Sequence, residues 1–183
     1  MTGKKMSLAL LVAGAGHHVA GWRLPEAEFG AENFDLIRRI VATAERGKFD
    51  VVFFADAVNA GRDAHPKHIV RLEPLTLLGA LCLCTSRIGL VATASTTYSE
   101  PYNIARAFAS IDHMSQGRAG WNVVTGASPD AAVNFGTDPF PSHEARYGRA
   151  EEYVEVAKGL WDSWEDDALA GDKATGVYMD RDK

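Results

Sequence analysis

Three polar side chains lie beside apolar segments of this sequence, where α/β proteins commonly bind ligands. Asp56 ends the apolar run Val51–Ala55. A carboxylate at the mouth of such a strand indicates a binding role, and the alternative is a loop cap. His143 and Tyr147 are four residues apart, so both fall on one face near the start of a predicted helix. They can direct hydrogen-bond donors at one ligand, and the alternative is a helix cap with a packed aromatic.

A hydroxyl-rich segment ends the next apolar run. Thr93 closes the run that begins at Ile88, and the small or hydroxylated residues Ala94–Tyr98 would let a ligand approach the backbone closely. The alternative is a strand cap whose hydroxyls are satisfied within the protein. Asn122 and Thr125 stand at the carboxyl end of a further predicted strand, where α/β folds place their chemistry.

Two other patterns point to binding sites but lack the context those sites need. Gly14 and Gly16 begin like a dinucleotide-binding loop, yet Gly and Pro residues break the helix that should follow, so residues 14–32 are predicted to be a long loop. His65 and His68 have a spacing that permits metal ligation. No carboxylate or cysteine completes their set, so a solvated loop without metal is expected.

Composition favours one globular unit without nucleic-acid or membrane partners. The 183 residues are 46% hydrophobic, and 19 basic against 24 acidic residues give a net charge of -5. No apolar run approaches the roughly 18 residues of a membrane span, and the segment after Lys4 lacks a small-residue cleavage site. Cys82 and Cys84 lie within an apolar helical run, which is typical of reduced core thiols in a cytoplasmic protein.

The elements that must position these side chains follow a β/α alternation. Apolar strands are predicted to begin near residues 7, 51, 88 and 119, and helices are predicted over 34–46, 74–86, 102–115 and 143–164. Strands that are apolar throughout and separated by helices are parallel and covered by those helices. A (β/α)8 barrel needs eight such units and typically about 250 residues. The predicted fold is therefore α/β of the TIM-barrel type, comprising the first four β/α units.

On this prediction residues 1–183 form the N-terminal half of a barrel, and the acidic and Gly-rich residues 165–183 form a truncated tail. A half barrel leaves its first and fourth strands as open edges and exposes its apolar inner face. We therefore expect a homo-oligomer. A non-catalytic remnant that serves as an oligomerisation module is the alternative from a different functional class.

The sequence resembles one group of luciferase-like flavin monooxygenases, the group of the nitrilotriacetate, pristinamycin and dibenzothiophene-sulfone enzymes. The resemblance covers nearly the whole chain and rests on many motifs in the same order. These motifs are Gly21–Arg23, Val52–Asp56, Arg71–Leu78, Ile88–Leu90, Ser95–Tyr102, Ala109–His113, Gly117–Thr125 and His143–Tyr147.

The resemblance implies a TIM-barrel monooxygenase that uses reduced FMN and O2 to oxidise a small organic substrate. A separate NAD(P)H:flavin reductase supplies the reduced FMN. By motif position, the family's flavin contacts correspond to Asp56, Thr93, His143 and Tyr147. No protein nucleophile is required, because the flavin carries the difficult step.

The resemblance also suggests that His17, Trp22 and Asn122 shape the substrate side of the pocket. Two departures accompany it. Gly126 stands where the family usually has Ser. Family members are also considerably longer, and the phosphate of FMN is expected to bind after the later strands of their barrels.

Overall fold

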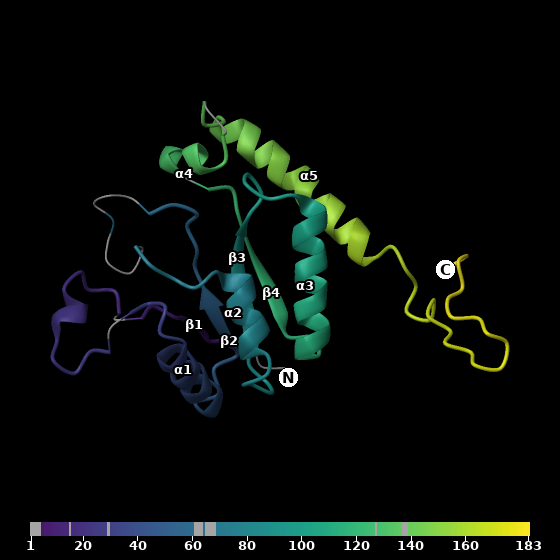
Figure 1. Cartoon of the computed structure of the whole chain (residues 1–183), viewed down its shortest axis with the longest axis horizontal. Helices are drawn as coiled ribbons and strands as arrows, with labels where there is room; N and C mark the ends of the chain where they lie inside the picture. Colours follow the sequence, from purple (N-terminus) through teal and green to yellow (C-terminus); the bar gives the residue numbers. More distant parts are fainter. Residues whose placement is uncertain are drawn as a thin grey trace.

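The computed structural model contains a parallel sheet of four strands in the order β1-β2-β3-β4 (Figure 1). It describes residues 5–14, 16–28, 30–60, 64, 69–126, 128–136 and 139–183. The strands are Ala9–Leu11 (β1), Val51–Phe54 (β2), Gly89–Ser95 (β3) and Ala119–Val124 (β4). Neighbouring strands follow one another in sequence, which is the topology of successive β/α units.

Each connection between strands carries a helix. The α-helices are Phe34–Arg46 (α1), Pro74–Leu81 (α2), Pro101–Ser115 (α3), Pro129–Asn134 (α4) and His143–Trp161 (α5), with a 3-10 turn at Gly21–Arg23 (η1). The predicted helix starts have clear local causes. The Asn33 side chain accepts a hydrogen bond from the Leu36 amide, and Glu73 does the same for the first turn of α2.

The hydrophobic core lies between the sheet and the helices. Val52, Leu90 and Ala92 are fully buried on the helix-facing side of β2 and β3. They pack in one cluster with the buried faces of the helices, which include Val41 of α1 and Leu78 of α2. Because side chains alternate along a strand, Thr93 and Ser95 project from the opposite face, toward the inside of the predicted barrel.

Two charged side chains hold the amino-terminal side of the sheet. One Glu45 carboxylate oxygen accepts hydrogen bonds from the amides of Ser86, Arg87 and Ile88 at 2.9, 2.7 and 3.0 Å. The Arg118 guanidinium donates to the carbonyls of residues 82, 85, 88 and 115. These contacts join α1, the end of α2 and the start of β4, on the side away from Asp56 and Thr93.

Three details correct the sequence predictions. The first strand is short, and Leu11 is 38% exposed rather than buried, because β1 is an edge strand and this side chain lies on the face without helices. The second helix ends at Leu81 instead of Ser86, because Arg118 binds the carbonyls that follow it. Cys82 is buried, but Cys84 is exposed and is not a core thiol.

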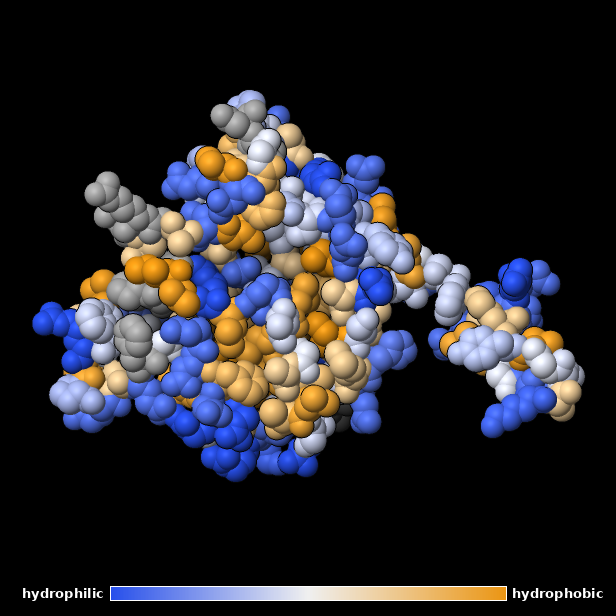
Figure 2. All heavy atoms as spheres, in the orientation of Figure 1, coloured by the Kyte–Doolittle hydropathy of each residue, from blue (hydrophilic) through white to orange (hydrophobic). Residues whose placement is uncertain are grey.

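Residues 162–183 extend away from the sheet and helices (Figure 1). Backbone hydrogen bonds connect distant residues of this tail, for example from the Glu165 amide to the Lys183 carbonyl at 2.9 Å. Figure 2 shows hydrophilic residues over α1 and apolar residues at the surface in the middle of the view, where Figure 1 places α2. Among the described residues, no helix is both long and apolar enough to cross a membrane.

Candidate functional site

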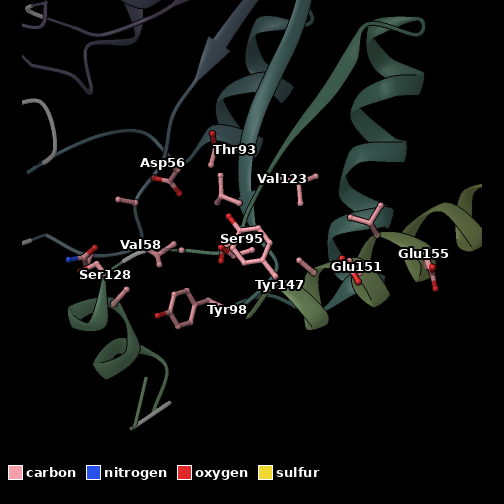
Figure 3. A pocket seen from close by; sticks show the side chains of 18 residues that line it. Asp56, Val58, Thr93, Ser95, Tyr98, Val123, Ser128, Tyr147, Glu151 and Glu155 are labelled. Carbon is pink, nitrogen blue, oxygen red and sulfur yellow. The ribbon is translucent and has the colours of Figure 1, made fainter. Parts of the chain in front are cut away.

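A cavity of about 820 Å³ lies at the carboxyl ends of β2, β3 and β4 (Figure 3). This volume is within the range typical of small-molecule sites. We call it the carboxyl-end pocket. Its lining residues come from the segment after β2, from β3 and the loop after it, from β4, from α4 and from α5: Asp56, Ala57, Val58, Asn59, Thr93, Ser95, Tyr98, Val123, Val124, Thr125, Gly126, Ser128, Ala131, Tyr147, Ala150, Glu151, Val154 and Glu155.

Asp56 lies directly after β2 and projects into this pocket with its side chain 18% exposed (Figure 3). The Arg71 Nε is 3.9 Å from its Oδ1, and the Arg71 side chain is equally buried. Burial raises the pKa of the Asp56 carboxyl group above its usual value, and the Ala57 amide and Arg71 partly oppose this change. The pocket therefore contains a hydrogen-bond acceptor that is substantially withdrawn from water.

Thr93 is 4% exposed and lies on β3 beside Asn122 of β4, its registered partner. The Asn122 Nδ2 donates a hydrogen bond of 2.9 Å to the Thr93 Oγ1. Thr93 lines the carboxyl-end pocket, whereas Asn122 is not among its lining residues. Asn122 therefore supports Thr93 from the neighbouring strand.

Tyr147 enters the pocket from the first turns of α5 (Figure 3). The Ser142 hydroxyl caps this helix by accepting from the Ala145 amide. The His143 and Tyr147 rings are stacked, with centroids 4.3 Å apart and planes 25° from parallel. Arg149 fixes the helix to the loop after β3, because its Nε donates to the Thr96 carbonyl at 2.9 Å. His143 contacts Tyr147 but is not itself among the lining residues of the pocket.

Tyr98 forms a further part of the pocket and is stacked on Phe135 at the end of α4, with ring centroids 4.6 Å apart. Its hydroxyl oxygen is buried and has no hydrogen-bond partner among the described residues. The backbone conformation at residue 126 favours glycine over the Ser that the family usually has there. The φ of Gly126 is +69°, and a Cβ there would lie 3.2 Å from the Tyr98 ring.

The structure does not bring every predicted residue to this pocket. His17 lines a separate cavity of about 90 Å³ together with Arg71, between the first loop and α2. Trp22 lies in η1, is 44% exposed and is not a lining residue of the carboxyl-end pocket. His65 and His68 lie outside the described residues. Within the described part of the chain, no group of three acidic, His or Cys side chains could hold a metal ion.

Tyr98, Glu151 and Glu155 are lining residues that were not among the predicted contacts. Tyr98 belongs to the hydroxyl-rich run after β3, but its contact with Phe135 spans a long stretch of sequence and has no local signal. Glu151 and Glu155 follow Tyr147 at intervals of four residues and so share its helix face. That spacing is a signal that could have identified them.

The sequence matches the model of the luciferase-like monooxygenase family over residues 9–176. It is 53% identical to the N-acetyl-S-(2-succino)cysteine monooxygenase of Bacillus subtilis (strain 168), over 100% of this chain and 42% of that protein. It is 48% identical to nitrilotriacetate monooxygenase component A of Aminobacter aminovorans, over 96% of this chain and 42% of that protein.

Among solved structures, the chain is similar to riboflavin lyase crystallised with modified FMN and riboflavin. The TM-score is 0.87 at 37% identity, over 98% of this chain and 43% of that chain. The chain thus spans about two fifths of the length of the relatives it matches. The expected fold is confirmed, since its parallel sheet corresponds to under half of a TIM-barrel monooxygenase. The chain belongs to the luciferase-like monooxygenase family.

Proposed function

We propose that the chain forms the ring-binding part of the flavin site in a two-component, FMN-dependent monooxygenase. In this proposal a separate NAD(P)H:flavin reductase supplies reduced FMN, and O2 and a small organic substrate are the other reactants. Both relatives described above are named as monooxygenases, and one of them is named as component A of its system. The similar riboflavin lyase holds a modified FMN in its crystal structure.

The observation that carries the proposal is the convergence of Asp56, Thr93 and Tyr147 on one pocket. The pyrimidine edge of an isoalloxazine ring presents an N–H between two carbonyl groups, so it needs an acceptor beside donors. A carboxylate and a hydroxyl supply these two roles. The buried Tyr98 hydroxyl, which has no partner among the described residues, also fits a site completed by a polar ligand.

The chain's own residues bind and orient the ring and exclude water from it. The Asp56 carboxylate would accept from the ring N–H, and the Thr93 hydroxyl would contact the adjacent carbonyl. Tyr147, with His143 stacked on it, would form an aromatic wall of the site. Apolar side chains such as Val58 and Val123 would exclude water from the ring. When bound, reduced FMN supplies the two electrons with which one oxygen atom of O2 enters the substrate and the other leaves as water.

The Asp56→Ala and His143→Ala variants test this proposal. Both should bind FMN more weakly, by roughly 10- to 100-fold for the carboxylate because a hydrogen bond to a charged group is lost. Asp35→Ala on α1 and His113→Ala on α3 are matched controls on exposed helix faces. Circular dichroism should show that all four variants remain folded. Unchanged FMN affinity in both site variants would contradict the assignment.

A second function is favoured by the exposed edges of the sheet. β1 and β4 end the strand order, and their residues Leu11 and Val123 are 38% and 41% exposed. A chain that acts only as an oligomerisation module would use these edges for tight self-association and would show no flavin affinity. Sedimentation velocity together with FMN titration separates the two functions.

A further inference from the structure

Thr93 and Asn122 form a cross-strand pair at the inner face of the sheet. They are register partners on β3 and β4, one residue along from the helix-facing pair Ala92 and Trp121. Thr93 is almost fully buried, and Asn122 is half-buried beside it. The hydrogen bond between them runs from the Asn122 Nδ2 to the Thr93 Oγ1 at 2.9 Å.

The direction of this hydrogen bond determines where the hydroxyl hydrogen of Thr93 can point. A threonine hydroxyl has one hydrogen and two lone pairs. Because one lone pair of Thr93 accepts from Asn122, its hydrogen cannot lie along the same line. Among the described residues, the Thr93 hydroxyl has no hydrogen-bond partner other than Asn122. The hydroxyl hydrogen is therefore available to an acceptor in the carboxyl-end pocket, which Thr93 lines together with Asp56.

We propose that Asn122 is a positioning residue that turns the Thr93 hydroxyl into a hydrogen-bond donor for a ligand carbonyl. The inference rests on the proposed flavin pocket and deepens it. Asp56 presents an acceptor and Thr93 a donor on the same side of the pocket (Figure 3). Together they select a cyclic imide edge, in which an N–H stands next to a C=O group. Asn122 thus acts on the ligand only through Thr93.

The first test detects the hydrogen bond between Asn122 and Thr93 in the ligand-free chain. In ¹H–¹⁵N spectra of the wild-type chain, one Asn122 side-chain amide proton should exchange slowly with solvent. Thr93→Val should accelerate that exchange by roughly tenfold, the equivalent of one ordinary hydrogen bond. Thr93→Ser should retain slow exchange. An Asn122 resonance that Thr93→Val leaves unchanged would overturn the proposed orientation.

The second test uses riboflavin, whose oxidised ring is neutral, so that added charge has little effect on binding. Asn122→Asp replaces the donating amide by a carboxylate that can only accept. The Thr93 hydroxyl must then donate to residue 122 and present a lone pair to the ligand. Riboflavin binding should weaken by roughly 10- to 100-fold, as it should for Thr93→Val. The double variant should lose no more than either single variant.

Asn122→Leu distinguishes orientation from packing. Leucine has a similar volume but neither donates nor accepts, so the Thr93 hydroxyl can still rotate toward the ligand, and the loss should be smaller than for Asn122→Asp. Asn103→Asp on the exposed side of α3 is the control for the added charge. Equal losses for Leu and Asp, or fully additive losses in the double variant, would overturn the proposal.

Failure of the proposed function gives a different result. If the wild-type chain does not bind riboflavin, the carboxyl-end pocket is not a flavin site, and the ligand proposed for the Thr93 hydroxyl is also wrong. The ligand-free spectra still decide whether Asn122 orients Thr93. The two failures are therefore recognised by separate measurements.

Discussion

At the residue scale, Asp56 is the clearest case of a charged side chain whose burial destabilises the fold. Its side chain is 18% exposed, and its one described cationic neighbour, Arg71, is 3.9 Å away, which is too far for a hydrogen bond. Burial raises the pKa of Asp56, although the Ala57 amide and Arg71 lower it in part. A group whose folded-state pKa is raised stabilises the fold when protonated, and this contribution disappears as the pH rises through the folded-state value.

Asp56→Asn should therefore raise the free energy of unfolding at pH 7 by up to about 1 kcal/mol, because an amide is less costly to bury than a carboxylate. The same change should weaken riboflavin binding. Urea denaturation at pH 7 and at pH 4 measures the first effect, and the gain should shrink at the lower pH. A loss of stability at pH 7 would instead identify Asp56 as a structural cap.

The sequence predicts a residue's position well where a local pattern controls it. Asp56 and Thr93 were found because each ends an apolar run, and Tyr147 because it is one helical turn from His143. The structure places Asp56, Thr93 and Tyr147 in one pocket. Loop conformation has no such periodicity, which is why the same reasoning could not predict that His17 and Trp22 lie away from this pocket.

At the element scale, Glu45 joins α1 to the start of β3. Its carboxylate is partly desolvated, which raises the pKa, but the amides of residues 86–88 outweigh this and hold the pKa below the usual value of 4.5. A group with a lowered folded-state pKa stabilises the fold above its unfolded-state pKa. That stability disappears as the pH falls through the folded-state value.

Glu45→Ala should reduce the free energy of unfolding at pH 7 by roughly 2 kcal/mol, because three backbone amides lose a charged acceptor. The difference from wild type should narrow as the pH is lowered below 4.5. Thermal unfolding over a pH series checks both statements, with Glu152→Ala on the exposed face of α5 as the control. A loss that is independent of pH would show that side-chain packing, rather than the carboxylate, is responsible.

The short helix α4 forms one wall of the carboxyl-end pocket through Ser128 and Ala131. Its contacts with other described segments include the Phe135 stack on Tyr98 and a 3.0 Å hydrogen bond from the Asn134 Nδ2 to the Val58 carbonyl. Stacked aromatic pairs contribute about 0.5–1.5 kcal/mol beyond area burial. We therefore expect the loss of the Phe135 ring to favour local opening of α4.

Phe135→Ala should increase amide hydrogen exchange in α4 by up to roughly tenfold. Val133→Ala changes a side chain of the same helix that is 78% exposed, so it should leave exchange near the wild-type rate. Hydrogen-exchange mass spectrometry of peptides covering residues 129–135 makes the comparison. Equal exchange in the two variants would mean that the stack does not hold α4.

The sequence predicts element type more reliably than element length. All four predicted helices begin within a residue of their predicted start. For the first three, Asn33, Pro74 and Pro101 are strong amino-terminal signals. The end of α2 depends on Arg118, which is far away in the sequence. The predicted helices do not include α4, whose stacking partner Tyr98 precedes it by a whole β/α unit.

At the scale of the whole molecule, the pocket has a polarity that suits the flavin ring better than a phosphate group. Its lining residues include Asp56, Glu151 and Glu155 but, within the described part of the chain, no Lys, Arg or His. The chain also spans about two fifths of its relatives. We therefore propose that these residues bind the isoalloxazine ring and that contacts to phosphate contribute little here.

Titration of the purified chain with riboflavin and with FMN, with mass in solution measured in parallel, tests this claim most directly. The predicted result is saturable binding of both, with riboflavin bound at least as tightly as FMN, because no cation among the described residues lines the pocket. Asp56→Ala should weaken both equally. Absence of saturable binding by a chain of uniform mass, or FMN binding that riboflavin does not share, would contradict the claim.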